Sequence, residues 1–349
     1  MTQEDRSHWV ELQRAVGLGE PVYTRAEVAE RTGVDPAMSR RLWRALGFAD
    51  AAEGDRIFTE ADAEMLGVAA ALVEDGAVAP DVAVQVTRVL GQSLARVADS
   101  QASSFEQVLA ADPAELPAAV RAISPTLEAF LIYTWRRHLA AALHSRETST
   151  AGGGSGIACV GFADLVGFTA ASQQRSYPEL AAMVERFESL AYDTIAVHGG
   201  RVIKMIGDEV MFAVARPAAA AHLALDIADE CAEDPLIPAA RVGVARGDTL
   251  RQEGDLFGPT VNLASRLVNI AAPGTVVVSD ELAEAIGDEP DLALRRLRPR
   301  HLRGIGEVRV HVLRRRPPPG SEEAEAPPAA PVVPAVRSRR RRRRRPPSG

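Results

Sequence analysis

The segment RVIKMIGDEVMFAVA, Arg201–Ala215, carries the clearest structural signal in the second half of the chain. Two runs rich in β-forming residues, Arg201–Ile206 and Val210–Ala215, flank Gly207-Asp208, which predicts a β-hairpin with a carboxylate in its turn. Four residues before this aspartate stands Lys204, the only lysine among 40 basic residues. A compact ammonium is not interchangeable with a planar guanidinium. We therefore infer that this position requires the shape of lysine as well as its charge.

Length and composition limit which folds and functions the chain can have. A chain of 349 residues with 46% hydrophobic and 25% charged residues predicts two globular domains. The net charge is −7 although the C-terminal tail is rich in arginine, so the body is acidic and not suited to bind nucleic acid through bulk charge. Two cysteines give neither a disulfide framework nor a zinc motif. Because no run of 18 apolar residues and no signal-peptide core occur, we expect a cytoplasmic protein without a membrane span.

Residues 1–147 are expected to form an all-α domain. Thr24 and Glu27 form a capping box ahead of a short helix that ends at Gly33, and Asp35-Pro36 opens a second helix. This pair, with the next helix opening at Phe58–Asp62, is similar to a helix-turn-helix of the MerR type.

Two interpretations of that pair stay open. Arg40, Arg41 and Arg44 would lie on a DNA-recognition helix, or the pair belongs to a regulatory bundle that does not bind DNA. The acidic surroundings, among them Asp50 and Glu60, favour the bundle.

Three longer helices are expected to follow, around Asp81–Asp99, Ser104–Ala122 and Ser124–Glu147. The last carries an apolar stripe at helical spacing, which predicts packing in a core or a dimer: Leu127, Phe130, Leu131, Trp135, Leu139 and Leu143. Residues 148–156 then contain TSTAGGGSG and are expected to form a hinge between the domains.

From residue 157 the pattern alternates between strands and helices, and 157–316 are expected to form a second domain with a βαββαβ core, giving an α+β protein. Its elements are predicted at Ile157–Phe162, Tyr177–His198, the hairpin, Ala218–Cys231, Ala240–Ala245, Gly274–Ser279, Asp280–Ile286, Leu292–Leu297 and Val308–Leu313. Residues 317–349 are rich in proline and then arginine, which predicts a disordered tail. That tail could make weak contact with nucleic acid or anionic lipid.

Several polar residues of this domain suit phosphoryl chemistry. Asp164, at a predicted strand end, and Asp208, in the hairpin turn, could face one another and hold Mg²⁺ or Mn²⁺. The backbone N–H groups of Phe168 and Thr169, which lead into a predicted helix, could bind phosphates.

A third group of polar residues lies in the segment Gly254–Ala271. Asp255 stands near its start, and Asn262 and Arg266 lie four residues apart, on one face of a predicted helix. An amide and a guanidinium placed in this way could position a sugar and stabilise a phosphoryl charge. A surface pair of side chains explains the same spacing.

Together these residues resemble the class III nucleotidyl cyclases, through FADLVGFT (162–169), IKMIGDEVMF (203–212), GDLFGPTVNLASRL (254–267) and LRGIGEV (302–308). The resemblance covers residues 157–313. It implies a ferredoxin-like catalytic domain that works as a homodimer with shared active sites. The N-terminal domain resembles, more loosely, the helical regulatory domain of some actinobacterial cyclases.

The resemblance also implies residue roles. Asp164, Leu165 and Asp208 would bind two Mg²⁺ or Mn²⁺ ions per site, and Lys204 and Asp255 would read adenine. Asn262 would orient the ribose and Arg266 would stabilise the transition state. Phe168, Thr169 and Arg303 would contact the substrate. The family usually has lysine where this chain has Arg303, and many members have arginine where it has Asp248.

The function that the resemblance implies is conversion of ATP to 3′,5′-cyclic AMP and pyrophosphate, under control of the N-terminal domain. The alternatives are a DNA-binding regulator whose cyclase-like domain senses nucleotide, and a guanylate cyclase. Lys204 and Asp255 argue against the latter, because guanylyl cyclases typically carry glutamate and cysteine at these positions.

Overall fold

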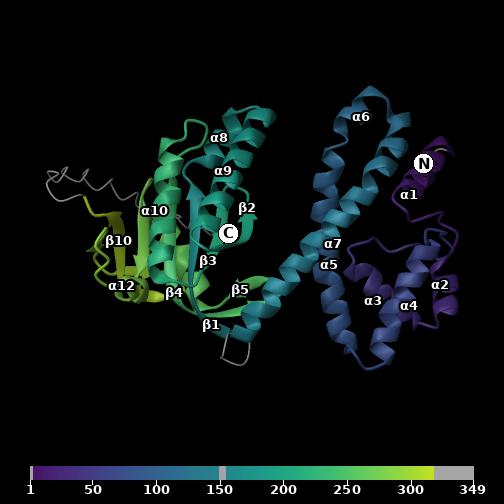
Figure 1. Ribbon diagram of the computed structural model, residues 1–349, viewed down its shortest axis with the longest axis horizontal. Helices are drawn as coiled ribbons and strands as arrows, with labels where there is room; N and C mark the ends of the chain where they lie inside the picture. The colour runs from purple at the N-terminus through teal and green to yellow at the C-terminus, as the bar shows by residue number, and fades with distance from the viewer. Residues whose placement is uncertain (1–2, 149–154, 318–349) are drawn as a thin grey trace, which may run out of the picture. The chain divides into compact units, whose positions relative to one another are not determined.

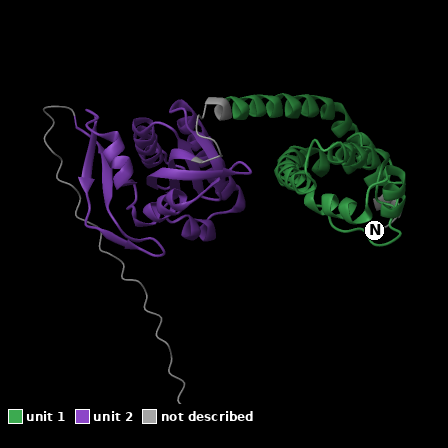
Figure 2. Cartoon of the chain, turned by 90° about the horizontal axis from the view of Figure 1, so that it is seen from below, with its two compact units in different colours: residues 1–148 green, residues 149–349 purple. Residues whose placement is uncertain are grey.

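The computed structural model describes residues 3–148 and 155–317. The chain divides into two compact units, Met1–Thr148 and Ser149–Gly349, drawn in different colours in Figure 2. The predicted tail, 317–349, lies outside the described residues apart from Pro317. Of the predicted hinge, 148–156, Thr148 belongs to a helix and Ser155 and Gly156 to a strand, and 149–154 lie outside the described residues.

The N-terminal unit is helical. Its elements are α1 (Gln3–Ala15), α2 (Arg25–Thr32), α3 (Pro36–Ala45), α4 (Glu60–Glu74), α5 (Pro80–Ser103), α6 (Glu106–Ala111), the 3-10 turn η1 (Pro113–Glu115) and α7 (Leu116–Thr148). The local end signals are confirmed: Thr24 and Glu27 form a capping box, Gly33 ends α2 in the left-handed region, and Asp35 caps α3.

The predicted helix boundaries at Ser104–Ala122 and at Ser124 were wrong. Asp112 and Pro113 break the first of these helices, because the Asp112 side chain caps a new turn by accepting from the Ala114 N–H. Helix α7 then begins at Leu116 and runs through Pro125, so the Ser-Pro pair lies inside a helix and does not start one. The Ser124 hydroxyl donates to the Val120 carbonyl one turn back, which is compatible with the helix continuing.

Most of the apolar stripe on α7 is not covered within the unit. Phe130 is 67% exposed, Trp135 59% and Leu143 54%, whereas Leu127 and Leu131 are half-buried. Packing in the core of this unit therefore does not account for most of the stripe.

The C-terminal unit confirms the α+β prediction. It contains the strands β1 (Ser155–Leu165), β2 (Arg201–Ile206), β3 (Glu209–Val214), β4 (Ala240–Gln252), β5 (Asp255–Phe257), β6 (Val276–Ser279), β7 (Leu292–Arg296), β8 (Arg300–Leu302), β9 (Gly306–Val308) and β10 (Val310–Arg315). Its helices are α8 (Phe168–Gln174), α9 (Tyr177–Val197), α10 (Pro217–Glu233), α11 (Pro259–Ile270) and α12 (Asp280–Ile286).

The main sheet has the strand order β2-β3-β1-β4-β6-β10-β7, with β5 paired to β4. Its first four strands, together with α9 and α10, give the predicted βαββαβ core. Two predictions need correction. Strand β1 extends to Leu165, so Asp164 lies within the strand, and β4 runs seven residues beyond the predicted end at Ala245 because it also pairs with β5 and with the start of β1.

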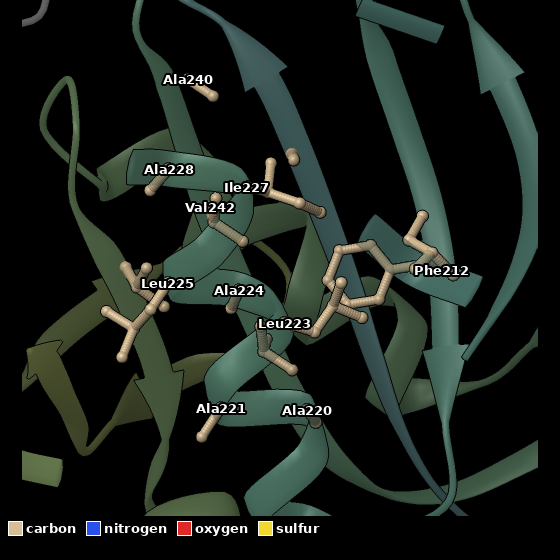
Figure 3. Close-up of a cluster of buried hydrophobic side chains, with 14 of the residues drawn as sticks. Phe212, Ala220, Ala221, Leu223, Ala224, Leu225, Ile227, Ala228, Ala240 and Val242 are labelled. Atoms are coloured by element: carbon tan, nitrogen blue, oxygen red, sulfur yellow. The ribbon is translucent and has the colours of Figure 1, made fainter. Parts of the chain in front are cut away.

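One face of the sheet is covered by α9, α10 and α12. Helices α9 and α10 lie side by side (Figure 1), and α10 buries a nearly continuous row of alanine and leucine side chains. Figure 3 shows this layer, in which Leu223 and Ile227 of α10 lie beside Phe212 from β3 and Val242 from β4. Burial of this apolar surface fixes the register of β1, β3 and β4.

Helix α11 covers the other face and buries Ala264, Leu267 and Val268. It approaches β4 closely at Gly243, where an added Cβ would lie 2.1 Å from the backbone nitrogen of Val268. The absence of a side chain on Gly243 therefore sets how near α11 lies to the sheet.

Gly243→Ala should destabilise the C-terminal unit by about 1–3 kcal/mol, because the helix backbone would have to move to make room. Urea unfolding followed by circular dichroism measures the change. Gly156→Ala is the matched control, since a Cβ on that strand glycine meets nothing within 4 Å. Equal unfolding midpoints for the two variants would contradict the close approach.

Candidate active site

The hairpin of β2 and β3 joins two groups of polar side chains. Gly207 takes a φ of +63° in its turn, which favours glycine, and Asp208 follows it. Lys204 lies on β2, just after a bulge against β3. One hairpin thus contributes a residue to the carboxylate group and a residue to the group around Asp255.

The carboxylate group forms where β1 meets the hairpin. The Leu165 N–H donates to the Asp208 carbonyl at 3.1 Å, which holds the end of β1 beside the turn. Burial raises the pKa of Asp208, and the neighbouring Asp164 carboxylate raises it further. Glu209 lies opposite Asp164 in the strand register, and the pKa of Glu209 is also raised, first by burial and then by the two aspartates. Three acidic groups therefore share this end of the sheet.

The donor set at this end suits a hard divalent cation. Within the described ranges, no group of three or more His, Cys, Asp or Glu side chains is arranged to hold a metal. Mg²⁺ is commonly bound by one or two carboxylates together with water and substrate phosphates. Asp164 and Asp208 provide such a pair of carboxylates, and the buried side chain of Leu165 leaves only its backbone carbonyl to contribute. The residues present fit Mg²⁺ or Mn²⁺.

The second group pairs Lys204 with Asp255 from β5. The Lys204 Nζ lies 2.5 Å from Asp255 Oδ2, with the two side chains 38% and 27% exposed. The other oxygen, Oδ1, accepts from the Leu256 N–H at 2.8 Å. An ammonium has three donors and a carboxylate accepts several hydrogen bonds, so each group keeps capacity for a ligand.

The remaining predicted residues lie at three other places, where Thr169, Asn262, Arg266 and Arg303 are exposed and Phe168 is half-buried. Asn262 and Arg266 lie one turn apart on the face of α11 that does not pack on the sheet. Arg303 lies between β8 and β9. Helix α8 begins at Phe168, whose ring packs against the core. The backbone N–H groups of Phe168 and Thr169 therefore belong to the first turn of this helix and have no partner within it.

The predicted site residues fall into separate groups within one chain. Their hydrogen bonds and ion pairs join Lys204 to Asp255 and the end of β1 to Asp208, and none of them joins Asn262 or Arg266 to either group.

Sequence reasoning missed Arg241, at the start of β4, and Glu209. Arg241 lies opposite Asp164 in the antiparallel register and forms an ion pair with it. In the sequence, an arginine near the start of one strand and an aspartate near the end of another do not indicate a contact by themselves. The contact could be predicted only if the pairing of β1 with β4 were known.

Both units of the chain are similar to known protein families. The family described as the adenylate and guanylate cyclase catalytic domain matches residues 154–315, and the adenylate cyclase regulatory domain matches residues 3–128. An adenylate cyclase of Glutamicibacter nicotianae is 34% identical over 325 residues, covering 86% of this chain and 80% of the relative. An adenylate cyclase of Streptomyces coelicolor is 40% identical over 277 residues, covering 76% and 71%. The crystal structure of the adenylyl cyclase CyaB from P. aeruginosa aligns with 46% of this chain and 95% of that chain, at 20% identity and a TM-score of 0.41.

The chain therefore belongs to the adenylate and guanylate cyclase family, and its catalytic domain follows an adenylate cyclase regulatory domain. The suspected family is confirmed. No helix within residues 3–148 and 155–317 is long and apolar enough to cross a membrane.

Proposed function

We propose that this chain is an adenylate cyclase that converts ATP to 3′,5′-cyclic AMP and pyrophosphate. The observation that carries the proposal is the contact between Lys204 and Asp255. The bond that forms joins the ribose O3′ to the α-phosphorus, the bond to the pyrophosphate oxygen breaks, and the hydroxyl proton is lost.

Lys204 and Asp255 suit the Watson–Crick edge of adenine. An ammonium donates to N1 and a carboxylate accepts from the N6 amino group. Guanine presents an N–H at N1 and a carbonyl at C6. The Lys204 ammonium would then face another donor, and the Asp255 carboxylate would face another acceptor. This chemistry favours ATP over GTP.

Asp164, Asp208 and the backbone of Leu165 would hold two Mg²⁺ or Mn²⁺ ions with the substrate phosphates. When bound, such ions lower the pKa of an attacking hydroxyl and offset phosphate charge. The carboxylates suit this task because they lie close together at one end of the sheet, where their mutual repulsion favours a bound cation.

The other residues take roles around the triphosphate and the sugar. Asn262 orients the ribose, and Arg266 stabilises the charge that develops on the α-phosphoryl group. The N–H groups of Phe168 and Thr169 and the guanidinium of Arg303 bind phosphate oxygens.

Each active site is shared between two copies of the chain. Asp164 and Asp208 come from one copy, and Lys204, Asp255, Asn262 and Arg266 come from the other. The proposal is supported by the separation within one chain, where α11 presents Asn262 and Arg266 on an exposed surface without a contact to the carboxylates. Two-fold symmetry then gives two equivalent sites per dimer.

DNA binding is the weaker candidate, since two of the three arginines on the possible recognition helix are paired with carboxylates of the same chain. Arg41 pairs with Asp81 at 2.8 Å, and the Arg44 Nε donates to Asp50 at 2.9 Å. A guanidinium held by a carboxylate of its own chain is not available to a phosphate without breaking that pair.

Production of cyclic nucleotide from ATP and from GTP tests the proposal, with purified chain, Mg²⁺ or Mn²⁺, and separation of the products by chromatography. We expect cyclic AMP from ATP and far less cyclic GMP from GTP. Retention of labelled DNA in a gel shift, together with no cyclic nucleotide, would favour the alternative.

The N-terminal unit should control this output. Helix α7 immediately precedes the predicted hinge in the sequence. Removing residues 1–147 should therefore change cyclic AMP production several-fold, and we expect an increase rather than a decrease. Comparing the full chain with residues 148–349 at equal molar concentration measures the effect. Equal specific activities for the two proteins would contradict control by this unit.

A further inference from the structure

Arg241 is held against one oxygen of a proposed metal ligand. Its Nε lies 2.7 Å and its terminal nitrogen Nη2 lies 2.5 Å from Oδ2 of Asp164. The two side chains are 30% and 16% exposed, so the pair is shielded from solvent more than most ion pairs on this surface. A charge-assisted contact of this kind restricts the carboxylate to one orientation.

Strand pairing explains why the contact forms. Asp164 on β1 lies directly opposite Arg241 on β4 and opposite Glu209 on β3. Directly opposed residues project from the same face of a sheet, so the arginine reaches the carboxylate group from the side of β4. Both of these contacts are made to Oδ2 of Asp164.

We propose that Arg241 is a positioning residue that orients Asp164 for divalent-metal binding. The inference rests on the proposed metal centre at Asp164 and Asp208. Carboxylates that bind metals are themselves commonly hydrogen-bonded, and loss of such a partner costs about 10- to 100-fold in metal affinity or activity.

A plain counter-ion would behave in the opposite way. If Arg241 only neutralised the acidic groups, or occupied the place of a cation, its removal would leave more negative charge for a metal and would tighten metal binding. The direction of the change therefore separates positioning from neutralisation.

The experiment measures Mn²⁺ binding to the full chain without nucleotide, from the loss of the free-ion signal in electron paramagnetic resonance. Arg241→Met keeps a long side chain without the charge and should weaken binding about 10-fold or more. Arg241→Lys should recover part of that loss, because it restores one charged donor to Asp164. The Mg²⁺ concentration for half-maximal cyclic AMP production should be raised in Arg241→Met and raised less in Arg241→Lys.

Arg186→Met is the matched control. Arg186 pairs with Asp234 at 2.7 Å in the same unit, outside the proposed site, so its loss removes an arginine–aspartate pair and should leave Mn²⁺ binding unchanged. Equal or tighter Mn²⁺ binding by Arg241→Met would overturn the inference, and so would an equal loss in Arg186→Met.

Asp208→Ala separates this inference from the proposed function. If Asp208→Ala binds Mn²⁺ as the unchanged chain does, the proposed metal centre itself is wrong. If Asp208→Ala loses Mn²⁺ while Arg241→Met retains it, only the role of Arg241 is wrong.

Discussion

Exchanging Lys204 for glutamate and Asp255 for cysteine should lower ATP turnover by about 100-fold or more and raise the relative use of GTP. A site built to hydrogen-bond one base edge rejects another because buried polar groups are left unpaired. The glutamate would accept from the guanine N1–H, and the thiol would be a weak donor to its carbonyl oxygen. Initial rates with ATP and with GTP, measured over a range of concentrations, give kcat/KM for each substrate.

Lys204→Arg is the informative control for this exchange. It keeps the charge, but its planar fork is poorly matched to a single ring nitrogen, so ATP turnover should fall nonetheless. Full ATP activity in the double variant would show that other residues read the base. Full activity in Lys204→Arg would show that only the charge is needed.

Asp208→Ala and Arg266→Ala should each lower the cyclase activity by about 100-fold or more. The first removes a proposed metal ligand, and the second removes the charge that stabilises the transition state, for which losses of about 10²–10³ are typical. The loss should fall on kcat for Arg266→Ala, because its interaction strengthens only as the reaction proceeds. Steady-state kinetics of the purified variants provide the test.

Asn269→Ala is the matched control for Arg266→Ala. Asn269 is exposed on the same helix, and its side-chain amide donates to the Ser265 carbonyl at 2.7 Å. We expect its activity to stay near that of the unchanged chain. A similar loss in both variants would mean that α11 tolerates no change, and the assigned role of Arg266 would have no support.

Local signals in the sequence predicted most of the fold. The capping residues Thr24 and Asp35 marked helix starts correctly, and Gly207-Asp208 marked the hairpin turn, because these effects act within a few residues. Pro125 misled the prediction of α7, since proline is favoured at a helix start and is also found inside long helices. The three-residue strands β5, β8 and β9 were missed because such short segments carry almost no periodicity.

Contacts between distant residues could not be predicted in this way. Lys204 and Asp255 were both expected to read the purine, but their direct contact across 51 residues depends on where β5 folds back along β4. The Arg241–Asp164 pair spans 77 residues and depends on the register of β1 with β4. Such contacts follow from sheet pairing, which buried residues such as Phe212 and Val242 fix through packing.

The most direct test of a shared active site is a mixture of Asp208→Ala and Arg266→Ala chains that are allowed to exchange subunits. A mixed dimer has one doubly damaged site and one intact site, which takes its metal ligands from the Arg266→Ala chain and its arginine from the Asp208→Ala chain. Random pairing makes about half the dimers mixed, so activity should recover to roughly a quarter of the unchanged protein. A mixture of Asp164→Ala with Asp208→Ala should recover nothing, because both changes damage the same half of a site. An inactive first mixture, with subunit exchange demonstrated by gel filtration of differently tagged chains, would contradict the shared site.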